Sequence, residues 1–188
     1  MEIAEAQRQV RSIYIGGSVG QLIIGILWLA SAALATWDSL LVGGWVLIIG
    51  GFFIYPLLQL VLRAAGKPAS LPAGNPLREL AIEVALMVGP LLFLVGAATL
   101  HRAVWFFPST MIVIGAHYLP FSFLYGMRQF IALGVALVFP GILIGMYAPQ
   151  FSTAGAWFTG AALVAFAFVG RAVAAREAAE GLSGAVAR

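Results

Sequence analysis

Two ionisable residues interrupt otherwise apolar stretches of the sequence, and they are the first candidates for chemistry. His117 lies inside the segment GAHYLPFSFLYGMR, residues 115–128, and Glu83 lies in a second apolar stretch. An imidazole exchanges protons near neutral pH, and a nearby carboxylate can pair with its charged form. An ionisable group in such surroundings usually faces a partner or a water-filled cavity. We therefore expect His117 and Glu83 to be the ionisable members of a polar pocket.

Polar and aromatic side chains recur at helical spacing near these two residues. Residues three, four, seven or eight apart share one face of a helix, which places Phe121, Tyr125 and Arg128 in one stripe with His117. The same spacing joins Tyr55 to Gln59 in another segment. The complete set of pocket candidates is Gln21, Tyr55, Gln59, Glu83, His117, Tyr125 and Arg128. An alternative is that these residues hydrogen-bond to one another and only fix the packing of the helices.

The residue types of the chain argue against metal, cofactor and catalytic sites. The chain has no cysteine, so disulfides, iron–sulfur clusters and cysteine nucleophiles are excluded. Its second histidine, His101, lies beside Arg102 and is not at a metal-binding spacing from His117. We expect no metal site and no cofactor, although axial haem ligation by His117 alone stays open. The only aspartate is Asp38, and no catalytic spacing recurs, so we favour a protein that is not an enzyme.

The composition indicates which elements position these residues. Of the 188 residues, 62% are hydrophobic and 9% are charged, which is far more apolar than a soluble domain of this length. An apolar stretch of about 20 residues can cross a bilayer as a helix. The sequence predicts six such stretches, at residues 13–36, 40–63, 78–100, 104–126, 129–148 and 153–174. The fold class we expect is all-α, a polytopic membrane protein with six transmembrane helices.

The charges predict the direction of the helices. With six crossings, nine of the ten Lys and Arg residues fall on one side of the membrane, and only Arg102 falls on the other. Basic residues favour the cytoplasmic side, so we expect both termini to be cytoplasmic, in a bacterial inner membrane. Residues 1–176 then form one transmembrane domain, and residues 177–188 form a flexible cytoplasmic tail. Because the net charge of +3 reports topology in such a protein, nucleic-acid binding is not expected.

The first span has one alternative interpretation. The sequence ASAALA at residues 30–35 resembles the cleavage site of a signal peptide. The apolar stretch before it is longer than signal peptides usually carry, and Glu2 and Glu5 dilute the positive charge that should precede it. We therefore expect the first span to persist.

Prolines and glycines predict bends and close helix contacts. Pro56, Pro90, Pro120 and Pro140 lie inside predicted spans, where each removes a backbone hydrogen bond. Such interruptions suit a cavity or a movable gate, and they also suit the ordinary tolerance of membrane helices for proline. Glycine pairs four residues apart allow helices to pack closely, either within one chain or between copies. A homo-oligomer is therefore a further expectation.

The segment GAHYLPFSFLYG, together with NPL at residues 75–77, resembles an uncharacterised family of small bacterial membrane proteins. In that family a Gly-Ala-His sequence precedes an aromatic residue, a proline, a second aromatic residue and Leu-Tyr. The likeness extends from the glycine-rich first span to the end of the sixth. It implies six helices and family-typical roles for His117, Pro120 and Tyr125. The family is a domain of unknown function, so the resemblance implies no particular activity.

Three functions are compatible with these features. The first is binding or transport of a small solute through a cytoplasm-facing polar pocket around His117. The second is a non-catalytic accessory or structural subunit of a membrane complex. The third is an intramembrane lipid-modifying enzyme in which His117 acts as a base. The expected partners are the lipid bilayer, a small-molecule ligand, and a second copy or another membrane protein.

Overall fold

The computed structural model describes residues 1–186, with side chains described for residues 1–177 and 179. This part of the chain consists of helices and turns and contains no strand. Its α-helices are α1 (Ile3–Ile13), α2 (Ser18–Trp37), α3 (Leu40–Ala64), α4 (Arg78–Leu86), α5 (Val88–His101), α6 (Phe106–Tyr118), α7 (Phe121–Tyr125), α8 (Gln129–Tyr147) and α9 (Ser152–Val186). The short 3-10 helices are η1 (Ile15–Gly17), η2 (Ala103–Trp105) and η3 (Pro149–Phe151).

Six helical segments of the described chain are long and apolar enough to cross a membrane. They are Ile15–Trp37, Leu40–Ala64, Arg78–His101, Ala103–Tyr125, Gln129–Tyr147 and Pro149–Glu177. Every bound lies within about four residues of the predicted one, so the prediction of an all-α, multi-pass membrane protein is confirmed.

Prolines divide two of the spans into shorter helices. Pro90 has no N–H to donate to the carbonyl of Leu86, and α4 ends at that residue. Pro120 likewise follows the end of α6 and precedes the first residue of α7. The third span is therefore α4 plus α5, and the fourth contains both α6 and α7.

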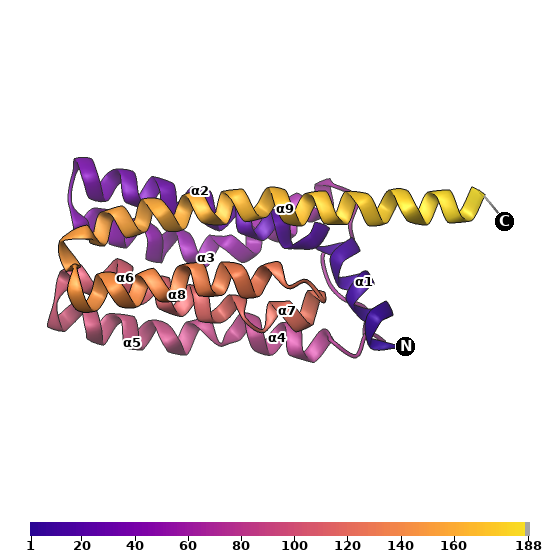
Figure 1. Ribbon diagram of the computed structural model, residues 1–188, viewed down its shortest axis with the longest axis horizontal. Helices are drawn as coiled ribbons and strands as arrows, with labels where there is room; N and C mark the ends of the chain where they lie inside the picture. Colours follow the sequence, from indigo (N-terminus) through magenta and orange to yellow (C-terminus); the bar gives the residue numbers. More distant parts are fainter. Residues whose placement is uncertain (187–188) are drawn as a thin grey trace.

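The spans form two groups that meet along α9 (Figure 1). Helix α2 packs along α3 and α9, whereas α6 packs along α5 and α8. Contacts of α9 with α6 and α8 join the two groups. The N-terminus, α1, α7 and the later part of α9 lie at one end of the bundle, which we call the terminal end. The turn after α2 and the helices η2 and η3 lie at the other, the far end (Figure 1).

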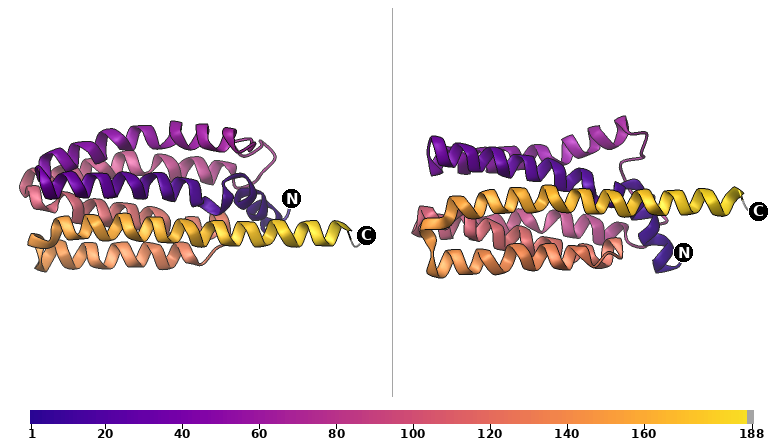
Figure 2. Two further views of the ribbon diagram at one scale, coloured as in Figure 1. Left: turned by 90° about the horizontal axis from the view of Figure 1, so that it is seen from above. Right: turned by 45° about the horizontal axis from the view of Figure 1, so that its top comes forward.

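The core lies between α2, α6, α8 and α9. Trp28, Phe107, Met111 and Leu133 are among its fully buried side chains, and the rings of Trp28 and Phe107 lie 5.9 Å apart. Two spans contribute little to this core. No residue of α3 between 51 and 61 is buried, and in the segment 78–94 only Val84 is buried. Figure 2 shows the part of α3 nearest the terminal end lying apart from α2 and α9.

Helix α1 crosses the terminal end instead of continuing the first span (Figure 1). The change of direction takes place at η1, where Ile15, Gly16 and Gly17 have positive φ angles of 51°, 63° and 80°. Such angles favour glycine. A side chain at Gly16 would also collide with the carbonyl oxygen of Gly170 in α9, so this turn is fixed against the last span.

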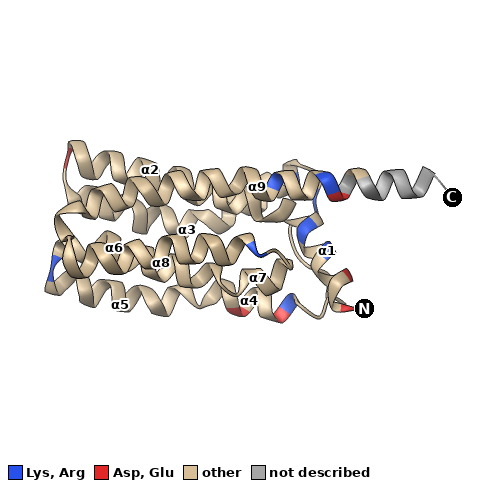
Figure 3. Cartoon of the chain, viewed as in Figure 1, with Lys and Arg blue, Asp and Glu red and all other residues tan. Residues whose placement is uncertain are grey.

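The charged side chains divide between the two ends as predicted. Figure 3 shows most Lys and Arg residues of the described chain at the terminal end. Arg102, between α5 and η2, lies at the far end. The predicted domain boundary at residue 176 coincides with no break in structure, because α9 continues to Val186. Of the expected flexible tail at 177–188, residues 177–186 are thus helical, and residues 187–188 lie outside the described chain.

Candidate functional site

Aromatic rings from four elements gather near the terminal end, and we call them the terminal aromatic cluster. Its members are Tyr14, His117, Tyr118, Phe121, Tyr125 and Phe130. The centre of the His117 ring lies 4.9 Å from that of Phe121, which lies 5.6 Å from that of Tyr125. The Tyr125 ring in turn lies 4.9 Å from Phe130 and 6.5 Å from Tyr14. Most of these pairs are tilted or edge-on, as the charge distribution of aromatic rings favours.

Although Pro120 interrupts the helix between α6 and α7, the residues on its two sides still share one face. The segment between α6 and α7 stays helical in its hydrogen bonds, with the N–H groups of Leu119 and Ser122 donating to the carbonyls of Ala116 and Leu119. Residues four apart therefore still lie on one side, although the proline interrupts the regular helix. The predicted stripe from His117 through Phe121 to Tyr125 is present as a row of ring contacts.

Within this cluster, His117 has a ring nitrogen that forms no hydrogen bond with the described residues. Its side chain is half-buried between Tyr118 and Phe121, and the imidazole approaches the backbone of Val84 in α4. The Nδ1 atom is buried and makes no hydrogen bond with the described residues. A buried polar atom without a partner costs free energy, so the site has an unused hydrogen-bonding group.

Glu83 does not join His117. Helix α4 packs toward the imidazole through Val84, which is buried, whereas Glu83 is exposed. Adjacent helical residues point about 100° apart, so one side chain cannot face inward where its neighbour does. Glu83 forms no salt bridge with the described residues, whose ion pairs are Arg11–Glu177 and Arg78–Glu79.

The two candidates from α3 have different surroundings. Tyr55 is exposed; the pKa of Tyr14 is raised by burial and, to a smaller extent, by Tyr55, so Tyr55 lies within electrostatic range of the terminal aromatic cluster. Gln59 is engaged elsewhere, because its side-chain amide donates a hydrogen bond of 2.8 Å to the carbonyl of Ala69. This bond connects α3 to the long turn before α4.

The two remaining candidates lie outside the row of rings. Gln21 in α2 is fully buried, and neither atom of its amide has a hydrogen-bond partner among the described residues. Arg128 lies in the turn before α8, where its side chain is exposed. The structure therefore brings His117, Tyr125 and Tyr55 to one region, and it places Glu83, Gln59, Gln21 and Arg128 in separate environments.

Sequence reasoning missed the polar contacts that hold α1 over the terminal end. Arg11 is buried, its Nε atom lies 2.7 Å from Glu177 in α9, and its Nη1 atom donates to the carbonyl of Tyr125. Gln7 donates to the carbonyl of Phe123 at 2.6 Å. Helix α1 is thereby attached to α7, and it lies directly beside the terminal aromatic cluster.

Asn75, in the long turn before α4, is a second residue that the sequence did not single out. Its amide nitrogen donates to the side chain of Gln9 at 2.7 Å and to the carbonyl of Ala6 at 3.2 Å. Its oxygen accepts a hydrogen bond of 2.8 Å from the N–H of Leu77. Both sets of contacts involve α1. The sequence signal for this helix was the four-residue spacing of the apolar residues Ala6 and Val10, which indicates an amphipathic helix before the first span.

The described part of the chain contains no group of three His, Asp or Glu side chains close enough to hold a metal ion. What the site offers is one imidazole nitrogen, several tyrosine hydroxyls and aromatic faces. Such a set suits a molecule with a flat or apolar body and one hydrogen-bonding group.

The chain belongs to DUF7010, a family of unknown function, which it matches over residues 3–172. The match confirms the predicted membership of an uncharacterised family and indicates no activity. No curated protein and no solved structure matches the chain.

Proposed function

We propose that this member of DUF7010 binds a small solute at the terminal aromatic cluster, with His117 supplying the central hydrogen bond. The observation that carries the proposal is the Nδ1 atom of His117, which is buried beside the rings of Tyr118 and Phe121 and has no hydrogen-bond partner in the described part of the chain. A ligand that bonds to this atom would remove the cost of leaving it unsatisfied. The aromatic rings would then stack on the body of the ligand.

A more specific form of this proposal is that the protein also transports the solute across the membrane. The helix breaks at α4–α5 and α6–α7 lie in the two spans that meet at His117. Interrupted helices beside a central site are common in transporters. By the charge rule we take the terminal end to be the cytoplasmic side of a bacterial inner membrane, so the site would load from the cytoplasm.

The test is ligand-dependent stabilisation of the purified protein. Small planar heteroaromatic compounds, beginning with imidazole, indole and nicotinamide, are screened for a rise in melting temperature in detergent. A compound bound at the cluster stabilises the wild type and loses most of this effect in His117→Ala, while Arg128→Gln behaves as the wild type. Compounds that stabilise the wild type are then tested for uptake into proteoliposomes. Equal stabilisation of wild type and His117→Ala would place the ligand elsewhere.

A second function is favoured by the surface of α3. Phe52, Phe53 and Leu60 are exposed by 74%, 57% and 64%, on a segment whose residues 51–61 are all unburied. A helix this exposed can serve as the contact of an accessory subunit with another membrane protein or a second copy. Photo-crosslinking from position 52 in native membranes, with position 143 on α8 as the comparison, would show whether a protein covers α3.

A further inference from the structure

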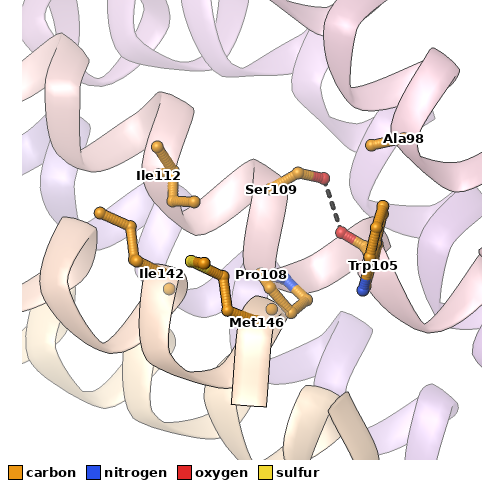
Figure 4. A pocket seen from close by; sticks show the side chains of 9 residues that line it. Ala98, Trp105, Pro108, Ser109, Ile112, Ile142 and Met146 are labelled. Carbon is orange, nitrogen blue, oxygen red and sulfur yellow. Dashed lines mark hydrogen bonds between the residues drawn. The ribbon is translucent and has the colours of Figure 1, made fainter. Parts of the chain in front are cut away.

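An apolar groove of about 240 Å³ lies toward the far end, away from the terminal aromatic cluster. Figure 4 shows Ala98 and Trp105 on one side, Ile142 and Met146 on the other, and Pro108 between them. The groove exists because α5 and α8 both pack on α6 and not along each other, so α6 forms a floor between two walls. The atoms exposed in it are apolar.

Trp105, in one wall of the groove, lies beside two basic residues of the far end, His101 and Arg102. The guanidinium of Arg102 lies 5.7 Å from the centre of the Trp105 ring, and the ring of His101 lies 5.4 Å from it. Both side chains are exposed, and neither forms an ion pair with the described residues. The apolar groove thus leads to an exposed positive charge.

The position of these groups matches the boundary of the membrane. Arg102 lies between the third and fourth spans, which end at His101 and begin at Ala103. At this level the lipid headgroups meet the hydrocarbon, and tryptophan and arginine side chains favour such an interface. The groove extends inward from there, into the depth occupied by acyl chains.

We propose that this groove binds an anionic phospholipid, with an acyl chain between α5 and α8 and the headgroup phosphate beside Arg102. The apolar atoms exposed in the groove suit a hydrocarbon chain. Arg102, which has no ion-pair partner in the described part of the chain, favours a headgroup of negative charge. This site is separate from the solute site around His117 and does not depend on it.

Quenching of tryptophan fluorescence by brominated lipid tests the proposal. The protein is reconstituted into phosphatidylcholine vesicles containing a small fraction of lipid with dibrominated acyl chains, carrying either a phosphatidylglycerol or a phosphatidylcholine headgroup. The contribution of Trp105 is the difference between the wild type and Trp105→Phe. We expect this contribution to be quenched half-maximally at an about fivefold lower fraction of the anionic lipid, the factor that one basic residue at a membrane surface contributes.

Substitutions distinguish recognition of the lipid headgroup from binding of its acyl chain. Arg102→Gln abolishes the preference for phosphatidylglycerol, whereas Arg128→Gln, at the terminal end, preserves it. Ala98→Leu fills the groove and weakens quenching by both lipids, whereas Ala97→Leu on the exposed side of α5 leaves quenching unchanged. Circular dichroism confirms that each variant remains helical. Equal quenching of Trp105 by the two lipids in the wild type, or an intact preference in Arg102→Gln, overturns the proposal.

Discussion

Val84, and not Glu83, is the residue of α4 whose backbone lies beside the imidazole of His117. The two helices of the expected acid–base pair do meet, but Glu83 is rotated out of the contact and is exposed. His117 is consequently surrounded by aromatic rings and backbone, without a carboxylate. This arrangement changes what substitutions at the two positions should do.

Glu83 and His117 should contribute independently to stability. We expect Glu83→Gln to change the free energy of unfolding by less than about 0.5 kcal/mol, because the side chain is exposed and forms no ion pair with the described residues. The double variant with His117→Ala should equal the sum of the single variants within about 0.5 kcal/mol. Unfolding by sodium dodecyl sulfate in mixed micelles measures all four proteins. A coupling above about 1 kcal/mol would show that the pair interacts after all.

The two histidines should differ in chemical reactivity. Diethyl pyrocarbonate should modify the exposed His101 quickly and the half-buried His117 slowly, which mass spectrometry of the modified peptides can follow. Phe121→Ala should accelerate modification of His117, because the Phe121 ring lies 4.9 Å from the imidazole. Phe123→Ala, an exposed position of the same helix, should not. Equal rates for both histidines in the wild type would be inconsistent with the buried position of His117.

Loss of Arg11 should release α1 from the bundle. Arg11→Met removes the donor to the carbonyl of Tyr125 and the partner of Glu177, and we expect a cost of about 1–3 kcal/mol. Glu177→Gln should cost less than about 1 kcal/mol, because the carboxylate is partly solvated. Hydrogen exchange of residues 3–13 should rise in Arg11→Met and stay unchanged in Arg8→Met, whose side chain is exposed. Unchanged exchange in Arg11→Met would show that other contacts hold α1.

Two glycines of the first span should respond oppositely to alanine. Gly16→Ala places a side chain at a positive φ of 63° and against the carbonyl of Gly170, so we expect a loss of at least about 2 kcal/mol. Gly20 has open space where its Cβ would lie, and Gly20→Ala should be neutral or slightly stabilising. The same micellar unfolding measurement compares them. Similar effects at both positions would contradict the tight approach of η1 to α9.

The direction of the chain in the membrane can be measured with single cysteines, since the natural chain has none. Ser70→Cys lies in the exposed turn before α4, and Gln150→Cys lies exposed at the far end. If the terminal end is cytoplasmic, a membrane-impermeant maleimide should label position 150 in spheroplasts and label position 70 only after permeabilisation. The reverse pattern would invert the topology and place the groove beside Trp105 on the cytoplasmic side.

The spans could be predicted from the sequence because span length and apolar composition are local properties. A helix of 19 residues or more with almost no charge has few alternatives to crossing the membrane. The residues that share the His117 face could also be predicted, since 117, 121 and 125 belong to one short segment. The row of ring contacts at these positions depends only on local helical spacing.

The pairing between spans could not be predicted in the same way. Whether Glu83 or Val84 faces His117 depends on a rotation of about 100°, and between residues 80 and 100 of the third span Glu83 is the only charged residue that could indicate it. Gln59 could equally have faced a pocket, but the long turn returns to α3 and accepts its hydrogen bond through Ala69. The docking of α1 required contacts between residues more than 100 positions apart, which spacing within one helix does not reveal.

The contacts of Arg11 also constrain the order of events during biosynthesis. Arg11 leaves the ribosome well before its partners, which lie 114 and 166 positions further along the chain. While the first three spans are being inserted, α1 has none of these partners. Glu177 can reach Arg11 only after the sixth span has entered the bilayer. Assembly of the terminal end therefore follows insertion of the sixth span, and a chain truncated before residue 177 should carry an α1 segment open to proteases.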